Sequence, residues 1–131
     1  MGTDSTKYLS YSEAVFLHLD HMRQIGETRC GTFERSLVES ALARPQQAAA
    51  YEDPDIIRQA ATLYFGLIKN HPWVGGNKRT ASVLVDEFLF RNQIEIHASV
   101  KGTIQLVLAI ESNRSQIDDI ESWLREHTAP F

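Results

Sequence analysis

The chain has 131 residues, a length typical of one domain, and its hydrophobic content of 43% excludes a disordered chain. Its net charge of −4 disfavours nucleic acid as a partner, and no apolar run approaches the ~20 residues that a membrane-spanning helix requires. The single cysteine, Cys30, excludes an intrachain disulfide and fits the reducing cytoplasm. We therefore expect one cytoplasmic domain over residues 1–131, in which residues 1–7 form a flexible lead.

The first third of the chain predicts two helices separated by a loop. The first helix begins at Ser10 or Ser12, whose hydroxyls are typical N-caps, and ends at Gly26. Its predicted apolar face consists of Val15, Leu19, Met22 and Ile25. After a loop over residues 27–33, a short helix is expected to stop before Pro45, because proline disrupts a helix interior. The apolar residues of that helix are Leu37, Val38, Ala41 and Leu42.

The segment from Pro45 to Pro54 allows two interpretations. Its three consecutive alanines favour a helix, because alanine has the highest helix propensity. Its bounding prolines favour an irregular loop or an extended flap instead. Both interpretations stay open at the level of sequence.

The rest of the chain predicts four more helices. A long one over residues 55–70 has so broad an apolar face that burial on two sides is expected, and it ends where a residue precedes proline. The next covers residues 77–91, and the link over residues 93–97 is compatible with a short strand. The predicted inward residues of the helix over residues 77–91 are Ala81, Leu84, Val85 and Phe88. A helix over residues 100–111, apolar nearly all round, is expected to be central, and an amphipathic helix over residues 116–127 closes the fold. The predicted fold is all-α, a compact bundle of about six to seven helices.

The loop between the two helices at the middle of the chain carries the strongest functional signal. It contains adjacent glycines, Gly75 and Gly76, which permit tight turns and let a ligand approach the backbone. Backbone N–H groups in such a turn, placed before a helix N-terminus, form a favourable site for phosphate oxygens. Lys78 and Arg79 add positive charge, and arginine binds phosphate through two parallel hydrogen bonds. His71 supplies a side chain that can remove a proton from a hydroxyl at neutral pH.

This loop resembles the signature of the Fic/Doc family, and in particular that of its short death-on-curing (Doc-like) toxins. The Fic pattern is His-x-Phe-x-acid-Gly-Asn-Gly-Arg-x-x-Arg. The positions that match it are His71, Gly76, Asn77 and Arg79. Lys78 replaces the last glycine and Ser82 the final arginine, and both changes resemble the Doc branch, whose motif reads Asn-Lys-Arg-Thr-Ala. The segments 37–46 and 88–92 also resemble these proteins, so the resemblance covers about residues 8–124.

The resemblance implies a Fic/Doc-type helical bundle whose active loop joins two central helices and binds ATP with Mg²⁺. Fic enzymes transfer AMP to a target hydroxyl. Doc-like members bind the nucleotide the other way round and transfer its γ-phosphate to a threonine of elongation factor Tu, which arrests translation. They are encoded with a small antitoxin whose disordered C-terminal segment folds onto the toxin. By position, residues 45–53 would form the flap that aligns the target peptide.

Carried over onto this sequence, the family's general base is His71. The residues implied to hold the nucleotide phosphates are Gly76, Asn77, Lys78, Arg79 and Thr80.

Gly75 departs from the family pattern, which has Asp or Glu at this position. That carboxylate helps to hold Mg²⁺, which prefers oxygen ligands, whereas glycine offers no side-chain ligand. Three interpretations are open: an engineered change that disarms a toxin, a natural variant of reduced or altered activity, or replacement by another carboxylate. The candidate replacements are Glu52, Asp53 and Asp86.

We therefore expect a Doc-like protein phosphotransferase, weakened or inactive because of Gly75, with an antitoxin and an elongation factor as partners. The alternatives are a Fic-type AMP transferase and a catalytically dead Fic-fold module that binds an antitoxin.

Four other residues receive structural interpretations. Trp73 is expected to anchor the loop in the core. His18 and His21 stand one helical turn apart without an evident third metal ligand, so a solvated or half-buried face is expected. Glu111 belongs to an acidic C-terminal region that is expected to be a solvated surface.

Overall fold

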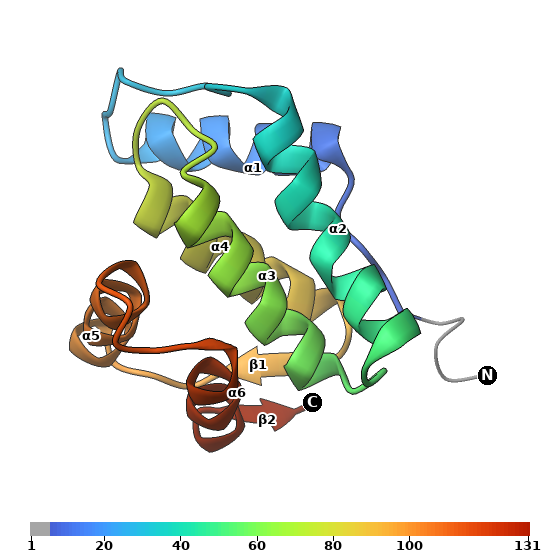
Figure 1. Ribbon diagram of the computed structural model, residues 1–131. Helices are drawn as coiled ribbons and strands as arrows, with labels where there is room; N and C mark the ends of the chain where they lie inside the picture. The colour runs from blue at the N-terminus through green and yellow to red at the C-terminus, as the bar shows by residue number, and fades with distance from the viewer. Residues whose placement is uncertain (1–5) are drawn as a thin grey trace.

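The computed structural model describes residues 6–131, and Figure 1 shows that helices make up most of the fold. Helices and strands follow in the order α1 (Tyr11–Gln24), α2 (Arg35–Tyr51), α3 (Ile56–Asn70), α4 (Asn77–Arg91), β1 (Ile94–Ile96), α5 (Val100–Glu111), α6 (Ile117–Glu126) and β2 (Thr128–Pro130). The all-α prediction is confirmed, with six helices and one two-stranded sheet over the described residues. None of these helices is both long enough and apolar enough to cross a membrane.

The predicted flexible lead falls mostly on residues 1–5, which lie outside the described residues. Its last residue, Lys7, is held at the C-terminal end of α4. The Lys7 N–H donates to Asn92 Oδ1 at 2.9 Å, and Asn92 Nδ2 donates to the Lys7 carbonyl at 3.0 Å. Two hydrogen bonds thus join Lys7 to Asn92, and the flexibility of the lead stays a prediction.

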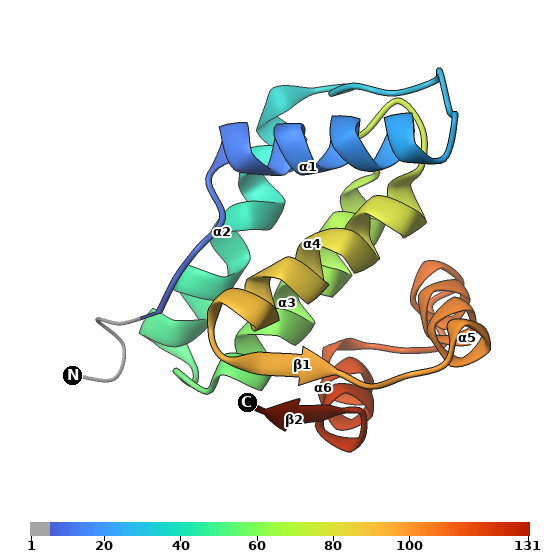
Figure 2. The same cartoon turned by 180° about the vertical axis from the view of Figure 1, so that it is seen from behind.

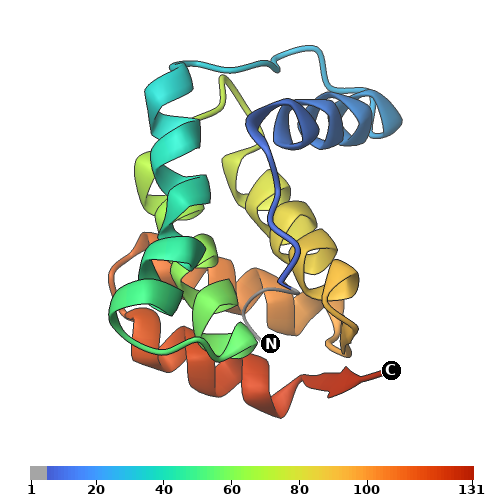
Figure 3. The same cartoon turned by 90° about the vertical axis from the view of Figure 1, so that its right-hand side faces the viewer.

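Helix α3 lies at the centre of the fold and packs against α2, α4 and α6 (Figure 3). Its start is fixed by Asp55, whose carboxylate accepts hydrogen bonds from the N–H groups of Ile57 and Arg58 at 2.8 and 3.2 Å. Its end at Asn70 agrees with the prediction, and the next residue, His71, adopts a left-handed conformation with φ 50°. Burial on two sides is confirmed, since ten of its residues are buried.

Helix α4 has the predicted bounds, and its four predicted inward residues are all buried. The predicted strand after it is β1, which pairs antiparallel with β2 at the end of the chain. Strand β2 was not predicted, because three residues are too few to show a period.

Helix α2 continues through Pro45 to Tyr51, so the predicted stop before Pro45 is wrong. Of the two interpretations of residues 45–54, the helix is confirmed over most of the segment, and an extended flap over residues 45–53 is not present. Pro45 and Ala48 are buried where α2 packs along α3. This packing and the alanine-rich turns outweigh the single N–H that proline removes from the helix.

Helix α1 presents a different face from the predicted one. Its buried residues are Ala14, His18 and Met22, so only Met22 was predicted correctly. Leu19 and Ile25 are exposed, and Val15 is partly buried. Small Ala14 and planar His18 bring α1 close to α4, a contact that an apolar pattern alone does not reveal.

Helix α5 lies at the edge of the molecule rather than at its centre, as Figure 2 shows. One face is buried through Leu106, Val107 and Ile110. The opposite side leaves Val100, Ile104 and Leu108 exposed. The prediction of a central helix is wrong. The sequence shows that a residue is apolar, but it does not show whether another part of the chain covers it.

Leu67, near the C-terminal end of α3, should contribute strongly to the stability of the fold. Its side chain is fully buried, so Leu67→Ala leaves a cavity and should lower the free energy of unfolding by about 2–5 kcal/mol. Chemical denaturation measures the change. The matched control Leu19→Ala truncates an exposed leucine of α1 and should cost less than about 0.5 kcal/mol. Equal losses in the two variants would contradict this core.

Candidate active site

The site loop (residues 71–76) and the α1–α2 loop (residues 25–34) lie at the same end of the molecule (Figures 1 and 3). Two backbone hydrogen bonds join the loops: Phe33 N–H to the Pro72 carbonyl at 2.9 Å, and Val74 N–H to the Gly31 carbonyl at 2.8 Å. The site loop is thus held on one side by α3 and α4 and on the other by the α1–α2 loop.

Asn77 closes the site loop with its side chain. Its Oδ1 accepts from the Trp73 N–H at 2.9 Å, and its Nδ2 donates to the Trp73 carbonyl at 3.0 Å. The Trp73 side chain is buried, which confirms its predicted role as an anchor. The amide of Asn77 is therefore occupied within the loop, and what Asn77 offers a ligand is its backbone N–H.

The first turn of α4 presents backbone donors at this loop. The first helical hydrogen bond runs from the Thr80 N–H to the Gly76 carbonyl at 2.8 Å. The N–H groups of Asn77, Lys78 and Arg79 precede it and have no acceptor within the helix. Together with the positive end of the helix dipole, they present the donors that the predicted anion site requires.

Position 76 requires glycine because of both the backbone conformation and the neighbouring atoms. Its φ of 66° is left-handed, which glycine adopts without a steric penalty. A Cβ atom here would also lie 2.6 Å from the Sδ atom of Met22 on α1.

Gly75 packs against backbone, which bears directly on the missing acid. A Cβ atom at this position would lie 2.5 Å from the Arg29 carbonyl oxygen in the α1–α2 loop. A backbone oxygen cannot rotate away as a flexible side chain does. An aspartate at position 75 therefore requires the α1–α2 loop to move.

His18 connects α1, the α1–α2 loop and α4 through one buried imidazole. Its Nε2 accepts from the Gly31 N–H at 2.9 Å, so the ring proton resides on Nδ1, which donates to Thr80 Oγ1 at 2.8 Å. The ring also stacks on Trp73, with centroids 4.3 Å apart. The prediction of a solvated or half-buried His18 is wrong, because the loop residues that enclose it are distant in sequence.

Burial, and to a smaller extent the neighbouring His21, lower the pKa of His18 to about 4. The imidazole is therefore neutral at physiological pH, as its two hydrogen bonds require. Within residues 6–131, no group of three or more His, Cys, Asp and Glu side chains is arranged to hold a metal ion.

A cavity of about 410 Å³ lies over the site loop. Its lining residues are Arg29, His71, Val74, Gly75, Gly76, Asn77, Lys78 and Arg79. Every site residue predicted from the sequence lines it except Thr80, whose buried hydroxyl is bonded to His18 instead. Three side chains of the lining are cationic, and none carries a carboxylate.

The ring of His71 is oriented by α3. Its Nδ1 lies 3.1 Å from the Ile68 carbonyl, which can only accept a hydrogen bond. Nδ1 therefore carries the ring proton, and Nε2 retains the lone pair that a general base needs. His71 is solvent-exposed, so a substrate hydroxyl can reach it.

The Fic/DOC family model matches residues 8–89, well over half of the chain. The chain belongs to the Fic/DOC family. No curated protein was found that matches the chain. The matched region contains the whole lining of the cavity, from Arg29 to Arg79.

Glu111 lies outside the matched region, at the C-terminal end of α5. Its Oε2 lies 3.1 Å from Lys78 Nζ. The sequence assigned Glu111 to a solvated acidic surface, and a separation of 33 residues gave no signal for the pair. Glu111 thus places negative charge on a lysine of the anion site.

The three carboxylates considered as substitutes for the motif acid are located elsewhere. Glu52 accepts from Arg58, and Asp53 accepts from the Asp55 N–H. Asp86 lines a separate cavity. None of the three lines the cavity over the site loop, so that interpretation of Gly75 is wrong for this arrangement.

The low pKa of His18 predicts a pH dependence of stability. Between pH 6.5 and about 4 the unfolded chain binds a proton at this site that the folded chain excludes. The free energy of unfolding should therefore fall as the pH falls through this range, and the His18 contribution should level off below about pH 4. Denaturation measured across pH should show a shallower slope for His18→Gln than for wild type. An unchanged slope in His18→Gln would contradict the assignment.

Removing the charge of Glu111 should strengthen anion binding at Lys78. Ion pairs at this level of exposure contribute up to about 1 kcal/mol, so Glu111→Gln should bind inorganic phosphate about 2- to 5-fold more tightly. Titration of the amide signals of residues 77–79 by NMR measures the affinity. Glu126→Gln removes an exposed acid of α6 and should leave the affinity unchanged. Weaker binding in Glu111→Gln would show that Glu111 supports the site instead.

Proposed function

We propose that this Fic/DOC protein is a Doc-like phosphotransferase, which transfers the γ-phosphate of ATP to a Ser or Thr hydroxyl of a protein target. The observation that carries the proposal is the placement of His71 Nε2 in the same cavity as the free N–H groups of α4, Lys78 and Arg79. A base and a phosphate site in one cavity are what transfer to a hydroxyl needs.

In the proposed step, His71 Nε2 takes the proton of the target hydroxyl. The hydroxyl oxygen bonds to the γ-phosphorus as the bond to the bridging β,γ-oxygen breaks, and ADP leaves. Lys78, Arg79 and the first-turn N–H groups of α4 hold the phosphate charge during transfer.

The donor set of the cavity fits phosphate better than it fits Mg²⁺. Mg²⁺ prefers carboxylate and other oxygen ligands, whereas the lining offers cationic side chains and N–H groups. Glu111, the acid that reaches this region, is paired with Lys78. The proposed step therefore involves no metal ion. Because Gly75 supplies no carboxylate, we propose that turnover is weakened.

The choice of phosphate over AMP transfer rests on Lys78 and Ser82, which follow the Doc branch of the motif. Ser82 Oγ lies 2.6 Å from the Tyr64 hydroxyl, so it is engaged with α3. By the same resemblance, the proposed target is elongation factor Tu in the cytoplasm, and the proposed regulator is an antitoxin with a disordered C-terminal segment. The packing of Gly75 against Arg29 supports one rival, a catalytically dead module that only binds an antitoxin.

Intact-mass spectrometry of elongation factor Tu, incubated with ATP, Mg²⁺ and the chain, tests the proposal. A phosphate-sized gain is expected, and His71→Ala should abolish it because the base is lost. A gain the size of AMP would identify an AMP transferase instead.

Two further variants separate the roles of Gly75. Gly75→Asp restores the family acid but must displace the Arg29 carbonyl, and Gly75→Ala introduces the steric effect alone. Activity that rises in Gly75→Asp and falls in Gly75→Ala would show that the missing acid limits turnover. No gain in mass with any variant would contradict transfer to this target and favour the dead module.

A further inference from the structure

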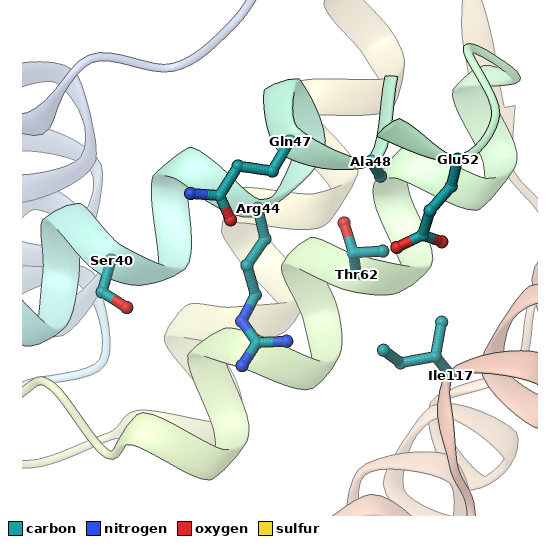
Figure 4. Close-up of a pocket in the computed structure, with 7 residues that line it drawn as sticks. All are labelled: Ser40, Arg44, Gln47, Ala48, Glu52, Thr62 and Ile117. Carbon is teal, nitrogen blue, oxygen red and sulfur yellow. The ribbon is translucent and has the colours of Figure 1, made fainter. Parts of the chain in front are cut away.

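A second cavity, of about 460 Å³, lies between α2 and α3, beside the start of α6. It is shown in Figure 4. Its lining residues are Ser40, Arg44, Gln47, Ala48, Glu52, Thr62 and Ile117. The cavity shares no residue with the one over the site loop.

The side chain of Arg44 is fixed across the surface of α3. A Cβ atom on Gly66 would lie 2.5 Å from Arg44 Cδ, so the arginine stem rests on the α3 backbone where a side chain is missing. Its guanidinium carbon lies 5.5 Å from the centre of the Phe65 ring, a favourable cation–π distance. The guanidinium is thus held in place before any ligand arrives, which reduces the entropy cost of binding.

No acceptor within residues 6–131 pairs with this guanidinium. Arg44 takes part in no ion pair and donates no hydrogen bond in the described part of the chain. The acids nearest to it along α2 are engaged elsewhere: Glu39 pairs with Arg35 and Glu52 with Arg58. A guanidinium that is partly buried and fixed, with its donors unused, is suited to a carboxylate or phosphate group.

The neighbouring charges decide between these two ligands. At the Glu52 end of the cavity, two arginines, Arg58 and Arg125, pair with four acids: Glu52, Asp118, Glu121 and Asp55. This excess of negative charge repels a polyanion such as a nucleotide more strongly than it repels a ligand with one carboxylate at the Arg44 end. Ala48 and Ile117 in the lining offer apolar contacts to the rest of such a ligand.

We propose that Arg44 binds the carboxylate of an acidic side chain in a protein segment that lies along the α2–α3 cavity. Ser40 and Gln47 share a face of α2 with Arg44 and supply further polar contacts (Figure 4). Gly66, beneath Arg44, precedes His71 by five residues, about 7 Å along the helix axis. If the proposed transfer takes place at His71, the same target segment reaches both residues, and Arg44 then selects targets with an acid near the modified hydroxyl.

NMR titration of the Arg44 Nε–Hε signal with a short peptide tests the proposal. The probe is a blocked pentapeptide with a central glutamate flanked by alanines, and its match has glutamine in place of glutamate. We expect saturable shifts at Arg44, Ser40 and Gln47 with the glutamate peptide, and at least several-fold weaker binding of the glutamine peptide.

Two arginine variants control for charge and fold. Arg44→Met keeps the aliphatic stem over Gly66 and should abolish peptide binding, while Arg23→Met removes an exposed arginine of α1 and should leave it intact. Equal thermal unfolding of the two variants would exclude misfolding as the cause. Binding retained in Arg44→Met, or an equal response to the glutamine peptide, would overturn the proposal. Binding of inorganic phosphate at Arg44 as tight as that of the glutamate peptide would also overturn it.

One more variant separates this inference from the proposed function. His71→Ala removes the proposed base and should bind the glutamate peptide as wild type does, because Arg44 is untouched. Peptide binding without transfer would therefore support the Arg44 site even if the transfer reaction failed. Transfer without peptide binding would overturn the Arg44 site alone.

Discussion

The neutral imidazole of His18 is the contact on which the geometry of the site depends. One ring nitrogen accepts from the Gly31 N–H and the other donates to the Thr80 hydroxyl, while the ring stacks on Trp73. These contacts join α1, the α1–α2 loop, the site loop and α4. A protonated ring cannot accept a hydrogen bond from the Gly31 N–H. The site therefore keeps this shape only while the buried imidazole is neutral.

The arrangement that this constraint fixes is strongly cationic. Arg29, Lys78 and Arg79 surround the free N–H groups of α4, and Glu111 provides the nearby negative charge. The Arg29 carbonyl fills the space beside Gly75. The loop conformation that supports the proposed anion site is therefore the same one that excludes a side chain at the position of the family acid. The α1–α2 loop can take this position only because residue 75 has no side chain.

Helix α3 links this site to the rest of the surface. Its C-terminal end orients His71 through the Ile68 carbonyl, and its middle carries Gly66, over which Arg44 lies. Because α3 is buried along most of its length, it gives both side chains a rigid support. The base directly follows α3, and the candidate recognition residue lies on α2 with its side chain against α3, so the packing of these two helices sets the separation of the two groups.

The sequence by itself determined the features that depend on neighbouring residues. The position of His71 before Pro72 set the end of α3, the helix start at Asn77 was predicted after the two glycines, and the ordered motif indicated the Fic/DOC family. Only the tertiary structure decided the features that depend on distant residues. Packing against α3 carried α2 through Pro45, the α1–α2 loop enclosed His18, and α5 brought Glu111 to Lys78. Periodicity records which residues share a face of one helix, but the partner that covers that face is set by the whole chain, because burial and charge pairing act through space.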